Sequence, residues 1–220
     1  MSLNIVIVNY ELGNIRSVIS AFEKFGVKAK LSNDKDKILM SDGLVLPGVG
    51  AFPQAMKNLE SYALKEVICN YANLNKPLLG ICLGMQLLFN QSEEFEITKG
   101  LGLIDGEVIK MPIKNSSFEK LPQVGFNTIK KHIIDWKGTI LEEIENNSDL
   151  YFVHGYAAKP KDEKHILSST NYSEFNFCST VKKGNIYGCQ FHPEKSAEQG
   201  LKVIENFIKI VTLNKSSSKL

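Results

Sequence analysis

Residues 77–89 read Pro-Leu-Leu-Gly-Ile-Cys-Leu-Gly-Met-Gln-Leu-Leu-Phe, an apolar run broken by two glycines and one cysteine. The part Pro77–Ile81 is typical of a strand buried on both faces of a parallel sheet. Met85–Phe89 indicates a helix, so Cys82 falls on a sharp turn between strand and helix. Glycines two residues before and two after the cysteine relieve crowding around such a strained turn. The stretch therefore predicts a thiol presented at the carboxyl end of a central strand.

The alternation of strand and helix continues toward the N-terminus. Apolar runs predict strands, and apolar residues spaced three and four apart predict helices. The predicted strands cover residues 4–8, 27–31 and 44–46, and the predicted helices cover residues 14–25, 53–59 and 62–73. This order favours an α/β fold, a doubly wound and mostly parallel sheet with helices on both faces. Ligand sites of such sheets lie beyond the carboxyl ends of the strands, which is where the cysteine falls.

The second half of the sequence differs, because β-like segments follow one another with turn residues between them. They cover residues 151–154, 166–169, 177–181 and 186–191, and a last helix is predicted over residues 197–211. We therefore expect an antiparallel portion in the C-terminal half. The chain shows no repeat and no internal linker, so we expect a single domain over residues 1–212 and a flexible, serine-containing tail over residues 213–220.

The composition argues against several classes of function. The 220 residues carry 26 basic and 24 acidic side chains, a formal net charge of +2 that gives no reason to expect a nucleic-acid or anionic-membrane surface. No apolar run approaches the roughly 18 residues that suggest a membrane span, so we expect a cytoplasmic protein. The four cysteines form no C-x-x-C pair and no metal-site spacing. We therefore expect reduced thiols, no metal and no cofactor.

The sequence His192-Pro193-Glu194 directly follows the predicted strand 186–191 and supplies what a thiol nucleophile needs. An imidazole base activates the thiol, and a carboxylate orients the base. Proline stiffens the turn, so Glu194 can accept a hydrogen bond from the ring nitrogen that does not face sulfur. Taken alone, Cys82 could equally be a small buried hydrophobe. Together the two segments favour a catalytic triad of Cys82, His192 and Glu194.

The segment Pro47–Gly50, Pro-Gly-Val-Gly, follows the predicted strand 44–46. Its two glycines let the backbone approach a substrate closely and reorient. The backbone N–H groups of Val49 and Leu83 are therefore predicted to form an oxyanion hole for the attack of sulfur on a carboxamide. The alternative is an ordinary tight turn.

The other three histidines are expected to have structural rather than catalytic roles. His132 and His165 lie beside lysines in polar segments, which predicts solvated surface positions. His154 ends an apolar β-like run, which favours a hydrogen-bonded structural residue near the site over a catalytic one.

Four segments of the sequence resemble the class I glutamine amidotransferases, specifically the glutaminase subunit of imidazole glycerol phosphate synthase. They are Pro47-Gly48-Val49-Gly50-Ala51-Phe52, Gly80-Ile81-Cys82-Leu83-Gly84-Met85-Gln86, Tyr151-Phe152-Val153-His154 and Gln190-Phe191-His192-Pro193-Glu194-Lys195-Ser196. The resemblance covers nearly the whole chain. Met85 and the pair Lys195-Ser196 favour this subfamily over the glutaminases of anthranilate synthase and carbamoyl phosphate synthase.

The resemblance implies a thioester mechanism: the cysteine attacks glutamine, ammonia leaves, and water then releases glutamate while the histidine moves protons. It also implies a glutamine-binding set, which is Gly48, Gly50, Gln86 and Glu94. The ammonia would pass to a (β/α)₈ cyclase subunit on a separate polypeptide, which implies a heterodimer. Residues 10–14 and 122–127 lie where the family docks on that partner.

The sequence departs from the family pattern without touching the triad. Residues 122–127 read Pro-Gln-Val-Gly-Phe-Asn where the family usually shows Pro-His-Met-Gly-Trp-Asn, and Gly155 stands in place of serine or threonine. The partner-facing surface can therefore differ. This keeps a second role open, that of a paralogous glutaminase supplying ammonia to a sugar amidotransferase for amidination of bacterial surface sugars.

Two other classes of function are open to test. A free-standing cysteine hydrolase would cleave other amides without a partner, but the glycine-rich turn 47–50 and the pair Gln86 and Glu94 favour a small carboxamide substrate. A non-catalytic interaction module would be expected to lack a member of the triad, and this sequence lacks none.

Overall fold

The computed structural model describes residues 3–113 and 120–217. The helices are α1 (Ile15–Glu23), α2 (Lys35–Leu39), α3 (Phe52–Ser61), α4 (Lys65–Asn73), α5 (Leu83–Gln86) and α6 (Ala197–Ser217), with 3-10 turns η1 (Glu163–His165) and η2 (Pro193–Lys195). The first strands are β1 (Ile5–Val8), β2 (Lys30–Ser32), β3 (Gly43–Leu46), β4 (Leu78–Ile81), β5 (Phe89–Ser92), β6 (Thr98–Lys99) and β7 (Ile104–Lys110). The later strands are β8 (Gln123–Thr128), β9 (Lys130–Lys131), β10 (Asp149–His154), β11 (Tyr156–Pro160), β12 (Ile166–Tyr172), β13 (Phe175–Lys183) and β14 (Ile186–Cys189).

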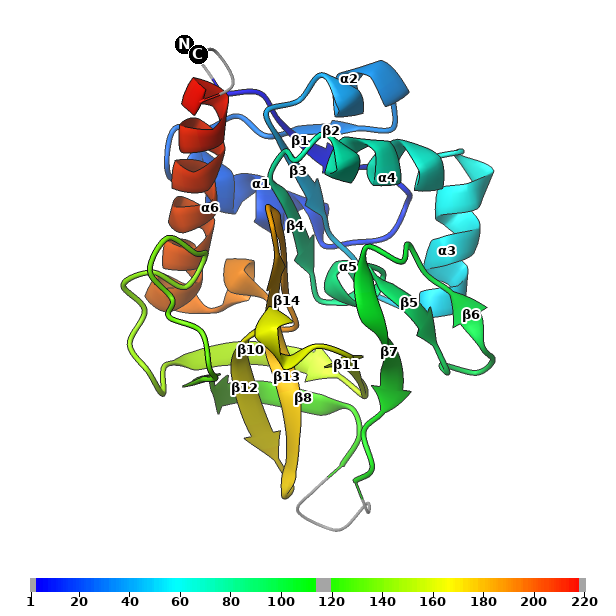
Figure 1. Cartoon of the computed structure of the whole chain (residues 1–220), viewed down its shortest axis with the longest axis vertical. Helices are drawn as coiled ribbons and strands as arrows, with labels where there is room; N and C mark the ends of the chain where they lie inside the picture. The colour runs from blue at the N-terminus through cyan, green and yellow to red at the C-terminus, as the bar shows by residue number, and fades with distance from the viewer. Residues whose placement is uncertain (1–2, 114–119, 218–220) are drawn as a thin grey trace.

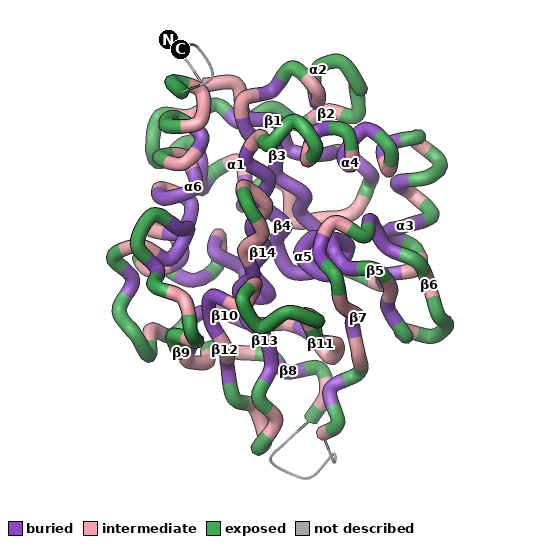
Figure 2. Tube along the Cα trace, viewed as in Figure 1, coloured by how far each residue is buried: buried purple, intermediate pink, exposed green. Residues whose placement is uncertain are grey.

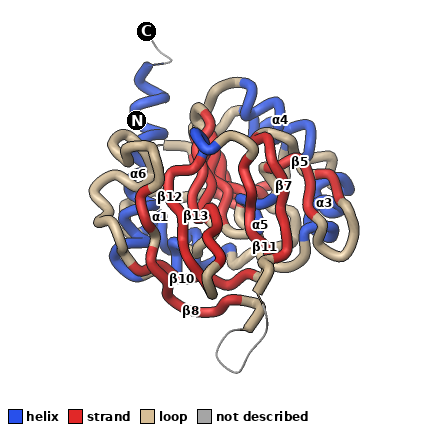
Figure 3. The backbone as a smooth tube through the Cα atoms, turned by 60° about the horizontal axis from the view of Figure 1, so that its bottom comes forward, coloured by secondary structure: helices blue, strands red, loops and turns tan. Residues whose placement is uncertain are grey.

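The central sheet has eight strands in the order β2-β1-β3-β4-β14-β13-β12-β9 (Figure 1). The strands from β2 to β14 pair in parallel, and the pairs from β14 to β9 are antiparallel. A separate pair, β10-β8, runs across β12 and β13, and a third sheet has the order β11-β7-β5-β6 (Figures 1 and 3). The predicted α/β class is confirmed, with a mostly parallel central sheet and antiparallel strands in the C-terminal half.

Helices cover both faces of the parallel strands. Strand β1 reads Ile-Val-Ile-Val and is buried throughout, so its successive side chains enter two different apolar clusters. Ile5 and Ile7 pack in the cluster that contains α1 and α6 residues, whereas Val6 and Val8 pack in the cluster of α3 and α4. The buried strands run between these helices in Figure 2. The sheet thereby places the carboxyl ends of β3, β4 and β14 side by side.

The predicted helix over residues 85–89 is wrong in its extent, because α5 ends at Gln86 and Phe89 begins β5. The helix ends where backbone N–H groups from a distant segment bond to the carbonyls of Leu87 and Leu88. The N–H of Leu101 donates to the carbonyl of Leu87 at 2.9 Å, and those of Leu103 and Ile104 donate to the carbonyl of Leu88 at 2.8 and 3.0 Å. Local apolar spacing could not reveal these partners from a distant segment.

Several other boundaries differ from the predictions. The predicted strand 27–31 is found later and shorter, as β2 at Lys30–Ser32. The last helix continues past its predicted end at Val211 through Ser217, where serine hydroxyls bond to carbonyls one turn back. Within the predicted tail, residues 213–217 are therefore helical, and residues 218–220 lie outside the described part of the chain. No helix among the described residues is long and apolar enough to cross a membrane.

Candidate active site

Cys82 stands between β4 and α5 in a strained backbone conformation, with φ 53° and ψ −111°. The flanking glycines are required by close approach. A Cβ on Gly84 would lie 1.8 Å from the carbonyl oxygen of Leu46, and one on Gly80 would lie 2.6 Å from the carbonyl oxygen of Gly84. The predicted strand–turn–helix geometry around Cys82 is thus present. Because α5 has only four residues, few peptide dipoles add at its N-terminus, so the partners of the sulfur matter more than the helix.

His192 lies beside Cys82 because it follows the neighbouring strand β14. Strands β4 and β14 are parallel, with Ile81 opposite Cys189, and the Cys82 N–H donates to the Cys189 carbonyl at 2.8 Å. The segments that follow the two strands therefore emerge next to each other. His192 Nδ1 lies 2.9 Å from Glu194 Oε1, and the two side chains are only 4% and 1% exposed. With Nδ1 donating to the carboxylate, Nε2 is the ring nitrogen left for the sulfur.

The charges around His192 determine its protonation. Burial lowers the pKa of this imidazole, but its hydrogen bonds to Cys82 and Glu194 and the charges of both groups outweigh burial and raise the pKa to about 10. At neutral pH His192 is therefore an imidazolium, held between a sulfur and a carboxylate. Such a pair is how cysteine nucleophiles are kept ready as thiolates.

Backbone and hydroxyl contacts fix the His-Pro-Glu turn against β10. The His192 N–H donates to the Tyr151 carbonyl at 2.8 Å. The Ser196 hydroxyl donates to the His192 carbonyl at 2.6 Å and accepts from the Tyr151 N–H at 2.9 Å. The imidazole thus projects from a turn that is bonded to β10 through both His192 and Ser196.

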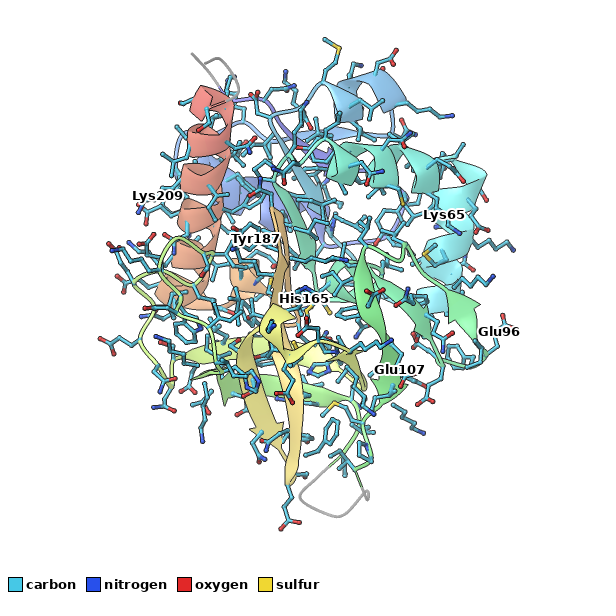
Figure 4. All side chains as sticks on the ribbon, viewed as in Figure 1. Lys65, Glu96, Glu107, His165, Tyr187 and Lys209 are labelled. Atoms are coloured by element: carbon cyan, nitrogen blue, oxygen red, sulfur yellow. The ribbon has the colours of Figure 1, made fainter. Side chains whose placement is uncertain are left out.

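A cavity of about 130 Å³ opens at the sulfur. It brings together residues from distant parts of the chain that the sequence had singled out: Val49, Gly50, Cys82, Leu83, Gln86, Glu94 and His192. Its volume is well below the roughly 300–1,000 Å³ of sites for drug-sized ligands, which fits a substrate no larger than an amino acid. A wider open groove of about 510 Å³ lies beside Glu107 on β7 (Figure 4), but no cysteine or histidine lines it.

Gln86 and Glu94 supply polar groups to the cavity lining. Gln86 Nε2 donates to the Tyr156 carbonyl and to Gln190 Oε1, both at 3.0 Å. Glu94 Oε2 accepts from the Phe52 N–H at 2.7 Å, and partial burial raises the pKa of Glu94 more than that bond lowers it. A fixed amide and a half-buried carboxylate are suited to recognising the polar end of a small substrate.

Two predicted site residues do not line the cavity: Glu194, which is bonded to His192 Nδ1, and Gly48. Gly48 is a buried residue of the Pro47–Gly50 segment, and a Cβ on it would meet the Tyr10 hydroxyl at 2.5 Å and Leu83 Cβ at 2.9 Å. The Tyr10 hydroxyl donates to the Pro47 carbonyl. Gly48 therefore lets the segment pack against the cysteine turn, and its predicted contact with substrate stays a prediction.

The sequence reasoning missed two contacts of the sulfur. Gln190 Nε2 lies 3.7 Å from Cys82 Sγ, and the Val153 carbonyl lies 3.8 Å from it. Gln190 belongs to the segment Gln190–Ser196 that resembles the family. It is a polar residue within an apolar strand-like run, and this was the signal that could have indicated its contact with the sulfur. A backbone carbonyl carries no such signal in a sequence.

The predictions for the other histidines are corrected in part. His132 and His165 are half-buried rather than solvated, and each has one buried ring nitrogen without a partner among the described residues. His154 is buried and hydrogen-bonded near the site, as the structural interpretation predicted, and it also lines the cavity. Within residues 3–113 and 120–217, no cluster of histidine, cysteine, aspartate or glutamate could hold a metal ion.

The strained cysteine turn, the His–Glu pair and the glycine-rich segment of this fold agree with comparison to known families. The model of the family Glutamine amidotransferase class-I matches residues 6–211. The chain belongs to the class I glutamine amidotransferases.

The similar curated proteins narrow the comparison to one kind of subunit. Imidazole glycerol phosphate synthase subunit HisH 1 of Legionella pneumophila (strain Lens) is 42% identical over 211 residues, covering 94% of this chain and 99% of the relative. Subunit HisH of Lactococcus lactis subsp. lactis is 44% identical, covering 93% and 97%. Subunit HisH of Methanosarcina barkeri is 45% identical, covering 93% and 97%.

Solved structures with lower identity share the fold. A putative GMP synthase protein from Thermoplasma acidophilum superposes with a TM-score of 0.74 at 20% identity, covering 100% of this chain and 99% of that one. PurLQS from Thermotoga maritima gives a TM-score of 0.69 at 20% identity, covering 95% and 99%. At this identity the likeness supports the architecture alone.

Proposed function

We propose that this chain is the glutaminase subunit of an imidazole glycerol phosphate synthase, acting in the cytoplasm in histidine biosynthesis. It hydrolyses glutamine to glutamate and passes the ammonia to a separate (β/α)₈ cyclase subunit in a heterodimer. The observation that carries the catalytic part is the hydrogen-bonded His192–Glu194 pair at the strained Cys82 turn. The relatives named HisH support the assignment of the partner. The lyase chemistry of the whole synthase belongs to the cyclase.

In the proposed reaction the Cys82 thiolate attacks the carboxamide carbon of glutamine. The carbonyl oxygen becomes an oxyanion, which the backbone N–H groups of Val49 and Leu83 stabilise. The His192 imidazolium gives its Nε2 proton to the departing nitrogen, so ammonia leaves and a thioester remains. Water then attacks the thioester, the neutral imidazole takes a proton from it, and glutamate leaves as the thiolate reforms.

Glutamine is oriented by two polar residues of the cavity lining, Glu94 and Gln86. Glu94, partly buried and facing the same cavity as the sulfur, accepts hydrogen bonds from the substrate's α-ammonium group. Gln86 lines the same cavity and is held by Tyr156 and Gln190. The small volume fits a single amino acid, which favours this proposal over a free-standing cysteine peptidase.

The β8 face supports a partner-binding surface. Val124 and Phe126 point outward and are 62% and 59% exposed, and Phe126 packs edge-on against Tyr151 at 5.5 Å between ring centroids. Tyr151 is also the residue bonded to the His192 turn. A partner that covers this face would therefore contact the element that holds the catalytic imidazole.

The test is glutamate release from glutamine by the purified chain, alone and with a cyclase subunit of imidazole glycerol phosphate synthase plus its nucleotide ligand. We expect weak release alone and strong stimulation by the loaded cyclase. Cys82→Ala should abolish release in both conditions, because no other group in the cavity can form the thioester.

The outcomes separate the candidate functions. Cys82-dependent release that the cyclase does not stimulate would keep the glutaminase and favour a sugar amidotransferase as the partner. Release that survives Cys82→Ala would contradict the mechanism itself.

A further inference from the structure

Beside the cavity, the pair β8–β10 places two polar side chains on its inner face. Gln123 on β8 is directly opposite His154 on β10. Opposite residues of an antiparallel pair project from the same face, with their Cβ atoms about 5 Å apart. Both residues are buried, at 3% and 6% exposed, whereas the next residue on β8, Val124, faces solvent. Gln123 and His154 therefore share one interior location.

The tautomer of His154 follows from its partner. His154 Nδ1 lies 2.8 Å from the Tyr156 carbonyl oxygen. A carbonyl only accepts, so Nδ1 carries the proton and Nε2 presents a lone pair. His154 Nε2 is buried and has no hydrogen-bond partner among the described residues. The ring packs against Phe177 at 4.9 Å and Phe152 at 5.7 Å between centroids, so its surroundings supply no polar contact from those sides.

Gln123 presents a second acceptor without a donor. Its Oε1 is buried and has no partner among the residues that the structure describes. Buried polar atoms are nearly always hydrogen-bonded to protein or to ordered water. Two acceptors on one inner face, with nothing donating to either, indicate a small occupant that brings its own N–H or O–H groups.

We propose that Gln123 Oε1 and His154 Nε2 hold the ammonia released at Cys82, a binding site on its way out of the cavity. The assignment rests on the proposed glutaminase function, because that reaction produces the ligand. His154 lines the same cavity as Cys82, and the carbonyl of the adjacent Val153 contacts the sulfur. The leaving nitrogen thus departs beside His154, and Gln123 lies behind the cavity lining, opposite His154 on the neighbouring strand.

The chemistry of the pair suits neutral ammonia. Ammonia has three N–H groups, enough to donate to both acceptors at once. Burial lowers the pKa of His154 to about 4, against a weaker opposing effect of its bond to Tyr156 and with a further lowering by His192. The imidazole is therefore neutral at physiological pH, and Nε2 has no proton to give. The site can hold ammonia without converting it to ammonium, which would lose the lone pair needed by an acceptor substrate.

An isotope experiment on the full chain tests the assignment without the partner. The chain is incubated with unlabelled glutamine and ¹⁵N-ammonium, and both glutamate and ¹⁵N-carboxamide glutamine are measured. Labelled glutamine forms when ¹⁵N-ammonia attacks the thioester at Cys82 and the thiolate leaves, which reverses the first step. The ratio of labelled glutamine to glutamate reports how often ammonia is held beside the thioester. Since it is a ratio, slow turnover does not affect it.

We expect Gln123→Met to lower the ratio about three- to tenfold, the effect of losing one neutral hydrogen bond. His154→Phe, which keeps the aromatic packing, should lower it similarly. Gln123→His restores an acceptor nitrogen and should recover most of the ratio. Thr128→Val, on the same strand but outside the cavity lining, is the matched control and should leave both products unchanged. Thermal midpoints of all variants establish that they fold.

Each result decides the question. Folded Gln123→Met and His154→Phe variants with the wild-type ratio would overturn the assignment and leave the pair as a site for structural water. If the wild type released no glutamate in a Cys82-dependent manner, the proposed function would fail, and this assignment with it. A lowered ratio in both variants, recovered by Gln123→His, supports the binding site.

Discussion

His154 and His192 lie in the same cavity, yet their pKa values shift in opposite directions. His192 is buried between a sulfur and a carboxylate, which together raise its pKa to about 10. His154 is buried among aromatic rings with one carbonyl partner, and burial lowers its pKa to about 4. One imidazole is therefore charged and the other neutral at the same pH. His192 can give a proton, whereas the unpartnered ring nitrogen of His154, Nε2, can only accept a hydrogen bond.

This difference predicts how His154 contributes to stability against pH. Its folded pKa is below its unfolded value, so the unfolded chain binds the proton first as the pH falls. The free energy of unfolding should therefore decrease through this residue between about pH 6.5 and pH 4, by the order of 3 kcal/mol, and change no further below that window. His154→Phe should remove this part of the loss.

Urea unfolding of wild type and His154→Phe at about pH 7 and about pH 4.5 measures the effect. The variant should gain stability relative to the wild type at the lower pH. An equal dependence on pH in both proteins would show that His154 is protonated or exposed in the folded state.

At the residue scale, the sequence singled out Cys82, His192 and Glu194, which the structure brings together, because each belongs to a short local motif. Cys82 lies between spaced glycines, and Glu194 follows His192 across a proline. What it could not predict were the partners supplied by other elements, such as Gln190 and the Val153 carbonyl at the sulfur. Those contacts depend on which strands become neighbours, and no local pattern specifies that.

At the scale of elements, β3 and α5 meet at the closest backbone approach in the site. Gly84 faces the carbonyl of Leu46 at the end of β3, and no side chain fits between them. Gly84→Ala should destabilise the chain by about 3 kcal/mol or more, because either β3 or the cysteine turn must move. Denaturant unfolding and Cys82-dependent glutamate release should fall together. A stable and active Gly84→Ala variant would contradict this packing.

Gly50 offers the matched control for that substitution. A Cβ there would meet nothing within 4 Å, although its φ of +107° disfavours any other residue. Gly50→Ala should therefore cost only about 1 kcal/mol or slightly more in stability, the cost of backbone strain alone.

The elements differ in how well local sequence specifies them. Strands β1, β3 and β4 are buried on both faces, so continuous apolar runs predicted them. Strands β7 and β8 mix buried, partly buried and exposed positions and depend on pairing with distant β11 and β10, which is why neither was predicted. The short polar helix α2 was also missed, although its capping residue Asp34, which accepts from two backbone N–H groups, was a usable signal.

At the scale of the whole molecule, the sheet separates two apolar clusters. Ile204 on α6 belongs to one cluster and Ile68 on α4 belongs to the other, and both are fully buried. Ile204→Val and Ile68→Val should each cost about 0.5–1.5 kcal/mol in free energy of unfolding. Because the side chains share no neighbours, the double variant should lose the sum of the two within about 0.5 kcal/mol. Urea unfolding of the three variants checks this, and a larger deviation would mean that the sheet transmits strain between its faces.

The same division has a genetic meaning. A destabilising substitution on the α1–α6 side of the sheet can be compensated by repacking only if the second substitution contacts the first site. Second-site suppressors that restore growth through such repacking should therefore map to residues of the same cluster, such as those around Phe22 and Phe207, which pack ring against ring. Residues of the α3–α4 side would be absent from that set, even though they lie only one strand thickness away.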